Sequence, residues 1–557
     1  MKNLRIGAIG AALLMVAAAC GGSSSSSADT IPFKVKAYPE AGPAECSGAG
    51  FKRISSTDAS TVVFELCEPD VAFLSKLALT NFVINDSGYL STATQDGSIV
   101  ENPNGTGPYK FSAWQKGQQI VLTRNNDYWG KQLATSGTAV VQWAAEAPAR
   151  LIQLKGGFAD GIDNVAVTDD AAIAADPSLK LVPREGLNIF YLGMNSGIAG
   201  DPFEKVEVRK AVALALDRQR IVDNFYRAGS EVATHFTPCS FEFACEGDDW
   251  YSQDIAAAKE LMASAGYPNG FKTEIAYRNV TRGYLPSPAT VAADIQDQLK
   301  AIGITVTIKE MESTAFLDAA SVGSLVGLHM LGWGADYTDP TNFLDYHFGQ
   351  NASPQFGQPI PAVYEPLAKA AKTSVPEERA ALYAEANNAL RENVPMIPIA
   401  HGASALAYAA NIVGAHSSPL GNEEFAAMGS GGDDVFVFTQ SGEPGGLYCA
   451  DESDGESLRV CGQISEGLYG FVTGSATLKP VLASGCTPSE DGLTWTCTLR
   501  TGVTFHNGAS FDATDVVDSF ASIWDCANPW HKGRTSVFEY WSLLSSFLNA
   551  DSCTKPE

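Results

Sequence analysis

Residues 291–308 read VAADIQDQLKAIGITVTI, and this short stretch contains signals for both kinds of secondary structure. Within residues 291–301 the apolar side chains recur at helical spacing, which predicts an amphipathic helix. Gly303 ends that pattern, and residues 304–308 alternate apolar and polar side chains as a half-buried strand does. A helix that leads directly into a strand is typical of α/β and α+β proteins.

The same two patterns recur along the whole chain. Helical spacing predicts further helices over residues 206–226, 254–265 and 377–393. Strand-like runs occupy residues 62–66, 120–123, 435–438 and 493–499. Residues 429–432 (Gly-Ser-Gly-Gly) interrupt the pattern and are interpreted either as a linker between two segments or as a surface loop.

Length, composition and charge limit the classes of protein that fit. The chain has 557 residues, 45% of them hydrophobic, so two or three packed domains are expected. Its formal net charge of -26 argues against nucleic-acid binding, which requires a basic surface.

The N-terminal residues predict export and a lipid anchor. Basic Lys2 and Arg5 precede a short apolar run over residues 6–19, which is too short to cross a bilayer and predicts a signal peptide over residues 1–19. Ala17-Ala18-Ala19-Cys20 resembles a bacterial lipobox with Cys20 as the lipidated residue; an ordinary signal peptide is the alternative. Residues 20–30 would then form a flexible tether to the bacterial cell membrane, in the periplasm or at the cell surface.

The chain has eleven cysteines, ten of them besides Cys20. An even number of cysteines in an exported protein predicts disulfides. Short spacings favour three pairs, Cys239–Cys245, Cys449–Cys461 and Cys486–Cys497. A zinc site of His235 with Cys239 and Cys245 is the alternative for the first pair, but without a Cys-x-x-Cys motif or a second spaced histidine we expect no metal.

Four stretches together resemble one known family. They are residues 102–130 (NPNGTGPYKFSAWQKGQQIVLTRNNDYWG), 194–217, 331–344 (LGWGADYTDPTNFL) and 491–520 (DGLTWTCTLRTGVTFHNGASFDATDVVDSF). Each is similar to a block of the extracytoplasmic solute-binding proteins of oligopeptide, dipeptide and nickel ABC importers, family 5. The resemblance implies an α/β, two-lobed periplasmic-binding-protein-like fold of type II, class C-like, with an extra domain on the first lobe.

The order of the blocks differs from the family's order. The block at residues 491–520 lies near the N-terminus in the family, whereas here it comes last, so we expect a circular permutation. The resemblance then implies that residues 31–97 form the second part of the extra domain, residues 98–200 belong to lobe I, and residues 201–397 form lobe II. Residues 398–428 return to lobe I, and residues 429–432 form the linker. Residues 433–480 are the first part of lobe I, and residues 481–557 are the first part of the extra domain. We hypothesise that disulfides of Cys46 and Cys553, which lie near the new ends of the chain, help to hold those ends together.

Two residues are expected to hold a zwitterionic guest. By the resemblance, Asp336 captures a ligand's α-ammonium and Arg282 its α-carboxylate, because buried charges need partners. The planar guanidinium of arginine can grip a carboxylate in two places. Asp336 could instead cap a helix or pair internally, and Arg282 could form a surface ion pair, with Arg278 as a competing carboxylate ligand.

Further candidates follow from the same resemblance. Trp333, Tyr337 and Tyr284 are candidates for lining the pocket, with a place in the hydrophobic core as the alternative. The remaining pocket candidates are Glu466, Gly467 and Leu468 on the cleft wall of the first lobe and Asn195 at the crossing to the second lobe.

These features favour a binding protein over an enzyme. The sequence contains no Gly-x-Ser-x-Gly, His-Glu-x-x-His or phosphate-binding glycine loop, and no second acid is placed opposite Asp336 and Asp339. We expect a monomeric lipoprotein that captures a small solute, a short, dipeptide-like peptide, without a cofactor and passes it to an ABC permease. The alternatives are an oligosaccharide, an opine or a metal chelate as ligand, a sensory or adhesive surface protein without transport, and an extracellular peptidase.

Overall fold

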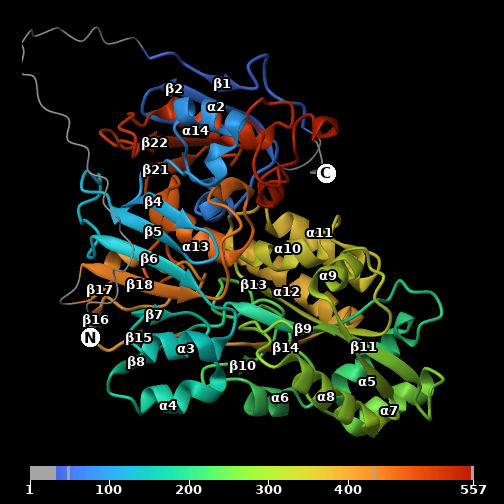
Figure 1. Ribbon diagram of the computed structural model, residues 1–557. Helices are drawn as coiled ribbons and strands as arrows, with labels where there is room; N and C mark the ends of the chain where they lie inside the picture. The colour runs from blue at the N-terminus through green and yellow to red at the C-terminus, as the bar shows by residue number, and fades with distance from the viewer. Residues whose placement is uncertain (1–32, 47–49, 431–433, 554–557) are drawn as a thin grey trace, which may run out of the picture.

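The computed structural model describes residues 33–46, 50–430 and 434–553. Cys20 and the predicted signal peptide therefore lie outside the described residues. Three large sheets organise the chain, and Figure 1 shows them as separate bodies at the top, the left and the lower right.

The first body, here called the extra domain, is built from both ends of the described chain (Figure 1). Its sheet has the order β1 (Ala37–Tyr38), β2 (Phe51–Asp58), β3 (Thr61–Leu66), β22 (Thr494–Leu499) and β21 (Ala483–Pro488). The sheet packs with α1 (Phe73–Leu77), α2 (Ser87–Asp96) and α14 (Ala513–Trp524). Aromatic rings dominate the core between them, among them Phe51, Phe64, Phe520 and Trp541.

The second body, lobe I, has a seven-stranded sheet. Its order is β4 (Tyr109–Gln115), β5 (Gln119–Arg124), β6 (Thr138–Trp143), β18 (Val435–Gln440), β7 (Gly161–Ile162), β15 (Ser404–Ala409) and β8 (Leu179–Arg184). β18 comes late in the chain, yet it lies between β6 and β7 and runs parallel to both. The helices of this lobe are α3 (Ala147–Lys155), α4 (Asp170–Ala174) and α13 (Gly455–Ile464).

The third body, lobe II, has a six-stranded sheet. Its order is β10 (Glu231–Val232), β14 (Met396–His401), β9 (Asn188–Met194), β13 (Leu328–Gly334), β11 (Lys272–Arg278) and β12 (Thr305–Met311). Its helices are α5 (Val206–Ala215), α6 (Arg218–Phe225), α7 (Ile255–Ser264), α8 (Pro288–Leu299), α9 (Ser313–Ser321), α10 (Leu344–Phe348), α11 (Pro361–Ala370) and α12 (Pro376–Asn393). The expected boundaries at residues 200 and 397 do not coincide with this sheet, because β9 precedes the first and β14 crosses the second.

Helix ends follow capping chemistry. The helix predicted over residues 206–226 is instead two helices, α5 and α6, because the Asp217 side chain accepts a hydrogen bond from the Arg220 backbone and starts a new helix. Asp254 caps α7 in the same way, accepting from the backbone N–H groups of Ala256 and Ala257. Half of the proposed linker is a strand, since β17 (Gly429–Ser430) pairs with β16 (Ile412–Val413).

The structure contains four disulfides among the described residues. Two of the predicted pairs, Cys239–Cys245 and Cys486–Cys497, are present. The predicted Cys449–Cys461 pair is wrong: both cysteines are free and buried, and both thiols donate to the same Leu447 carbonyl, at 3.8 and 3.6 Å. Cys46 pairs with Cys67 and Cys553 with Cys526, so each cysteine staples its own segment rather than one chain end to the other.

Within the described residues, the search for membrane-spanning segments finds no helix with the length and apolarity to cross a bilayer.

A candidate ligand-binding cleft

A cavity of about 350 Å³ lies where the three bodies meet. Its volume falls in the range of small-molecule sites, about 300–1,000 Å³. Lobe II contributes Arg282 and residues 334–336 at the end of β13, while Tyr540 comes from the extra domain. The lobe I lining includes Asp163, Asn164, Arg184, Ser441, Ser453, Gly455, Glu456, Leu458 and Arg459.

Asp336 lies in this cavity with its carboxylate held from two sides. Asn342 donates to one carboxylate oxygen at 2.9 Å, and the Tyr540 hydroxyl donates to the other at 2.9 Å. Burial raises the pKa of Asp336 to about 6, and the hydrogen bonds from Asn342 and Tyr540 oppose that rise. Asp336 is therefore largely ionised at neutral pH, and it is oriented before any guest arrives.

Neighbouring Asp339 has a structural role. Its side chain accepts from the Thr341 backbone at the start of a short 3-10 helix, and it pairs with Arg379 at 2.8 Å. The helix capping considered for Asp336 in the sequence thus belongs to Asp339, whereas Asp336 is paired internally only by its hydrogen bonds from Asn342 and Tyr540.

Arg282 lines the same cavity and is exposed. Its guanidinium donates to the carbonyl of the adjacent Thr281, at 3.2 Å, and it forms no ion pair with the described residues. The competing Arg278 is committed elsewhere, since it donates to Ser313 at 3.0 Å and to the Tyr284 hydroxyl at 3.2 Å. Of these two arginines, Arg282 is the one whose guanidinium is free to meet a guest in the cavity.

The opposite wall carries a buried ring of charges that the sequence did not reveal. Arg184 contacts Asp163 at 3.0 Å and Glu423 at 2.6 Å, and Arg459 contacts the same two carboxylates at 2.7 and 3.0 Å. Burial alone would raise the pKa of Asp163 and Glu423, but the two arginines hold both pKa values below their ordinary range. The four side chains neutralise one another within lobe I.

Known proteins share this architecture and are 25–31% identical to this chain over the matched residues. The family model described as "Bacterial extracellular solute-binding proteins, family 5 Middle" matches residues 22–355 and 477–546, more than half of the chain. The chain belongs to this family. Di/tripeptide-binding protein 1 of Pseudomonas aeruginosa is 31% identical over 379 residues, covering 66% of this chain and 70% of that protein. Heme-binding protein A of Haemophilus influenzae is 29% identical over 403 residues, covering 71% of each chain.

A solved structure agrees with this family assignment. The dipeptide-binding protein of Pseudoalteromonas sp. SM9913, crystallised in complex with Met-Leu, is 25% identical and has a TM-score of 0.61; the match covers 68% of this chain and 76% of that one. The relatives are solute-binding proteins of ABC transporters, so this family 5 protein is a solute-binding protein and not an enzyme.

The aromatic candidates of this family 5 protein lie outside the cavity. Trp333 stacks on Tyr346 with ring centroids 4.2 Å apart. Tyr337 is 1% exposed and packs in the core of the extra domain, while Tyr284 accepts a hydrogen bond from Arg278. None of the three predicted aromatic side chains is among the residues that line the cavity.

Glu466 holds the block at residues 102–130 against the segment that follows α13. It accepts hydrogen bonds from Thr106, Tyr128 and Trp129, all from the block at residues 102–130, at 2.7–2.8 Å. Glu466 and Gly467 line a smaller cavity of about 150 Å³ instead of the larger one. Leu468 is fully buried in the core of the extra domain.

Asn195 is also structural. Its amide donates to the Gly323 carbonyl at 2.7 Å, and its side-chain oxygen accepts from the Gly197 backbone at 2.8 Å. Both polar ends of this 4%-exposed side chain are thus used within lobe II.

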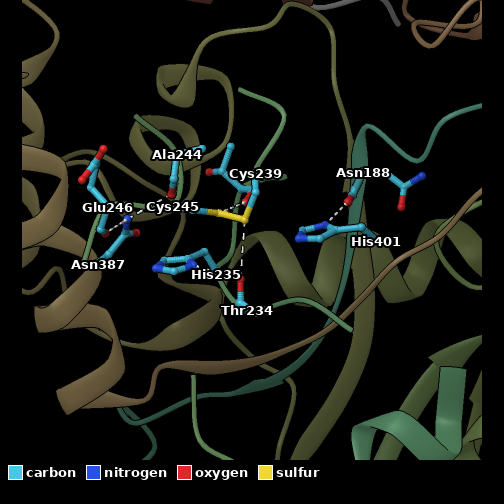
Figure 2. The surroundings of a disulfide bond; sticks show 10 residues. Asn188, Thr234, His235, Cys239, Ala244, Cys245, Glu246, Asn387 and His401 are labelled. Carbon is cyan, nitrogen blue, oxygen red and sulfur yellow. Dashed lines mark hydrogen bonds between the residues drawn. A yellow bond between two sulfur atoms is a disulfide. The ribbon is translucent and has the colours of Figure 1, made fainter. Parts of the chain in front are cut away.

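The cysteines considered for zinc are bonded to each other (Figure 2). Thr234 lies between His235 Nδ1 and Cys239 Sγ, at 3.1 and 3.5 Å, and Asn387 holds the loop by donating to the Ala244 and Glu246 carbonyls. Zinc is bound by cysteine thiolates, and a disulfide has none.

Proposed function

We propose that this solute-binding protein captures a short peptide, dipeptide-like in length, and delivers it to an ABC permease. The observation that carries the proposal is that Arg282 and Asp336, of opposite charge, line one cavity between the lobes. The free Arg282 guanidinium would bind the peptide's carboxylate, and the oriented Asp336 carboxylate would bind its ammonium.

Closure of the cleft follows from the same contacts. Arg282 and Asp336 belong to lobe II, whereas the facing wall belongs to lobe I. A guest that contacts both walls binds the closed form better than the open one, so it shifts the protein towards closure. The permease would then receive the closed, loaded protein.

The relatives support a peptide as the ligand class. One is named a di/tripeptide-binding protein, and one solved neighbour holds Met-Leu. The heme-binding relative points instead to a metal chelate, and binding of heme is therefore one of the outcomes to be measured.

Calorimetric titration of the purified protein with a free dipeptide, its N-acetyl form and its C-amide form tests the proposal. The free dipeptide should bind, and each capped form should bind about tenfold or more weakly, because each loses one charge-assisted contact. Absence of dipeptide binding, together with clear binding of heme or another solute, would overturn the peptide assignment.

We also propose that Cys20 carries a lipid, which would anchor the protein outside the cytoplasm as a monomer. The lipobox-like Ala17-Ala18-Ala19-Cys20 supports this. Mass spectrometry of the mature N-terminal peptide should show an acylated Cys20, and an unmodified cysteine would overturn the anchor.

The circular permutation remains our proposal too, with the expected domain division adjusted so that β9 and β14 belong to lobe II. The permutation and this division are supported by the two separate family matches and by β22, from residues 481–557, pairing with β3, from residues 31–97. A chain rearranged so that residues 433–557 precede residues 31–428 should fold and bind the same ligand. Failure of that rearranged chain to fold would count against the permutation.

A further inference from the structure

The charges around the cleft do not cancel completely. Six charged side chains line the cavity, namely Asp163, Arg184, Arg282, Asp336, Glu456 and Arg459. Arg184 and Arg459 are neutralised in the buried ring by Asp163 and by Glu423 behind it. Arg282, Asp336 and Glu456 remain, one cation and two anions.

A zwitterionic dipeptide would use the first two of these charges and leave the third. Its carboxylate would pair with Arg282 and its ammonium with Asp336, as in the proposed function, on which this inference rests. Glu456 would then face the occupied cavity as an acid without a counter-charge, and removing a charge from water without a partner is costly.

Glu456 is positioned to meet such a counter-charge. It is the second residue of α13, is half-buried, and its Oε1 accepts a hydrogen bond from Ser441. No described residue donates a hydrogen bond to its Oε2. The carboxylate is therefore held in place at one oxygen while the other stays available.

The nearby cations are committed elsewhere. Arg459 attracts Glu456 electrostatically, but its guanidinium donates its hydrogen bonds to Asp163, Glu423 and Gln440. Arg150, which also attracts it, donates to four backbone carbonyls and has the exposed Glu146 close by. From the extra domain, exposed Glu539 adds more negative charge near Asp336.

We propose that Glu456 determines ligand specificity by selecting peptides that carry a basic side chain. The lysine or arginine side chain of the guest would point across the cleft towards lobe I and place its cation at Glu456 Oε2. The two walls then have separate roles, because lobe II binds the peptide termini and lobe I recognises the side chain.

Calorimetric titration of the full protein with Ala-Ala, Lys-Ala and Ala-Lys tests this. At least one lysine dipeptide should bind about fivefold to tenfold tighter than Ala-Ala, the size expected of a partly screened ion pair. Glu456→Gln should reduce that preference to about twofold or less, since it keeps the shape and removes the charge. Glu490→Gln is the matched control, because this exposed acid in the β21–β22 turn changes the net charge equally but does not line the cavity.

A measurement on the unmodified protein keeps the test independent of how the variants fold. The preference for the lysine dipeptide should shrink moderately as salt rises from about 0.02 M to about 0.5 M, because Glu456 is only half-buried and its ion pair is partly screened. Equal affinity for all three dipeptides, or a preference that survives in Glu456→Gln, would overturn this inference while leaving the peptide-binding function in place. If none of the dipeptides binds, both proposals fall.

Discussion

Three arginines line the larger cavity, and they differ in what they contact. Two of them, Arg184 and Arg459, lie on the lobe I wall, and Arg282 lies on the lobe II wall. The first two each touch the same two carboxylates, whereas Arg282 touches only a neighbouring backbone carbonyl among the described residues. The two lobe I arginines are paired before a ligand arrives, and the lobe II arginine is left to meet it.

This difference shows that charge at a cavity wall is not by itself a sign of a binding residue. A buried ion network holds a wall in shape, and breaking one of its members leaves an uncompensated charge. A cation with unused hydrogen-bond donors costs little while it is exposed to water and becomes useful when a carboxylate enters. Four predictions test whether the buried ring supplies stability while Arg282 and Asp336 supply binding of the peptide termini.

The largest effect is expected from Asp163→Asn on lobe I. It leaves Arg184 and Arg459 with one carboxylate fewer, so the free energy of unfolding should fall by about 3–5 kcal/mol. Urea unfolding measures this. Asp297→Asn, in an exposed pair with Lys300 at 3.2 Å, is the control and should cost less than about 1 kcal/mol. Equal losses in both variants would show that the ring is not what stabilises lobe I.

The next effect concerns Arg282→Ala on lobe II. Affinity for a free dipeptide should fall about tenfold to a hundredfold through loss of a charge-assisted contact. The melting temperature should stay the same, because this exposed side chain holds no other element. Arg278→Ala is the matched control, since Arg278 bonds Ser313 and Tyr284 and does not line the cavity. A larger loss of affinity in the control would transfer the carboxylate-binding role to Arg278.

A third prediction uses pH. Asp336 has a pKa raised to about 6 by burial, and only its ionised form attracts an ammonium. Binding should therefore be strong above that pKa and weaken about tenfold from about pH 7 to about pH 5 as the carboxyl takes up a proton. Titration calorimetry across this range measures the change. Asp336→Asn should bind weakly throughout and show no such slope; a slope that persists would point to another titrating group.

The smallest effect is expected from Tyr540→Phe. It removes one hydrogen bond that stabilises the ionised Asp336, so the pKa of Asp336 should rise further. Dipeptide affinity near neutral pH should fall about twofold to fivefold, as expected for one hydrogen bond. The midpoint of the pH profile should move upward, and an unchanged midpoint would argue against a positioning role for Tyr540.

Local features of the fold were predictable because their causes are local. Apolar spacing marked α7, and the alternation after Gly303 marked β12. The break between α5 and α6 was missed because apolar spacing continues through it, although Asp217, the capping residue, was visible in the sequence.

The candidate site was predictable only where a motif pointed to it. Asp336 and Arg282 come from recognisable blocks, and both line the cavity. The ring was missed because its members are separated by many residues, and nothing local in the sequence marks Asp163 as a partner of Arg459. Tyr337 shares a motif with Asp336, but as the next residue in the loop it points into the core.

The pairing of β3 with β22 has a consequence for how the chain is made. The first strands of the extra domain are synthesised early, yet β22, the neighbour of β3 in the sheet, follows only after the strands of both lobes. Until then β3 presents an open edge, which is prone to join other strands, and contacts so distant in sequence form slowly. A chain cut short before β21 would leave that edge without its neighbouring strand.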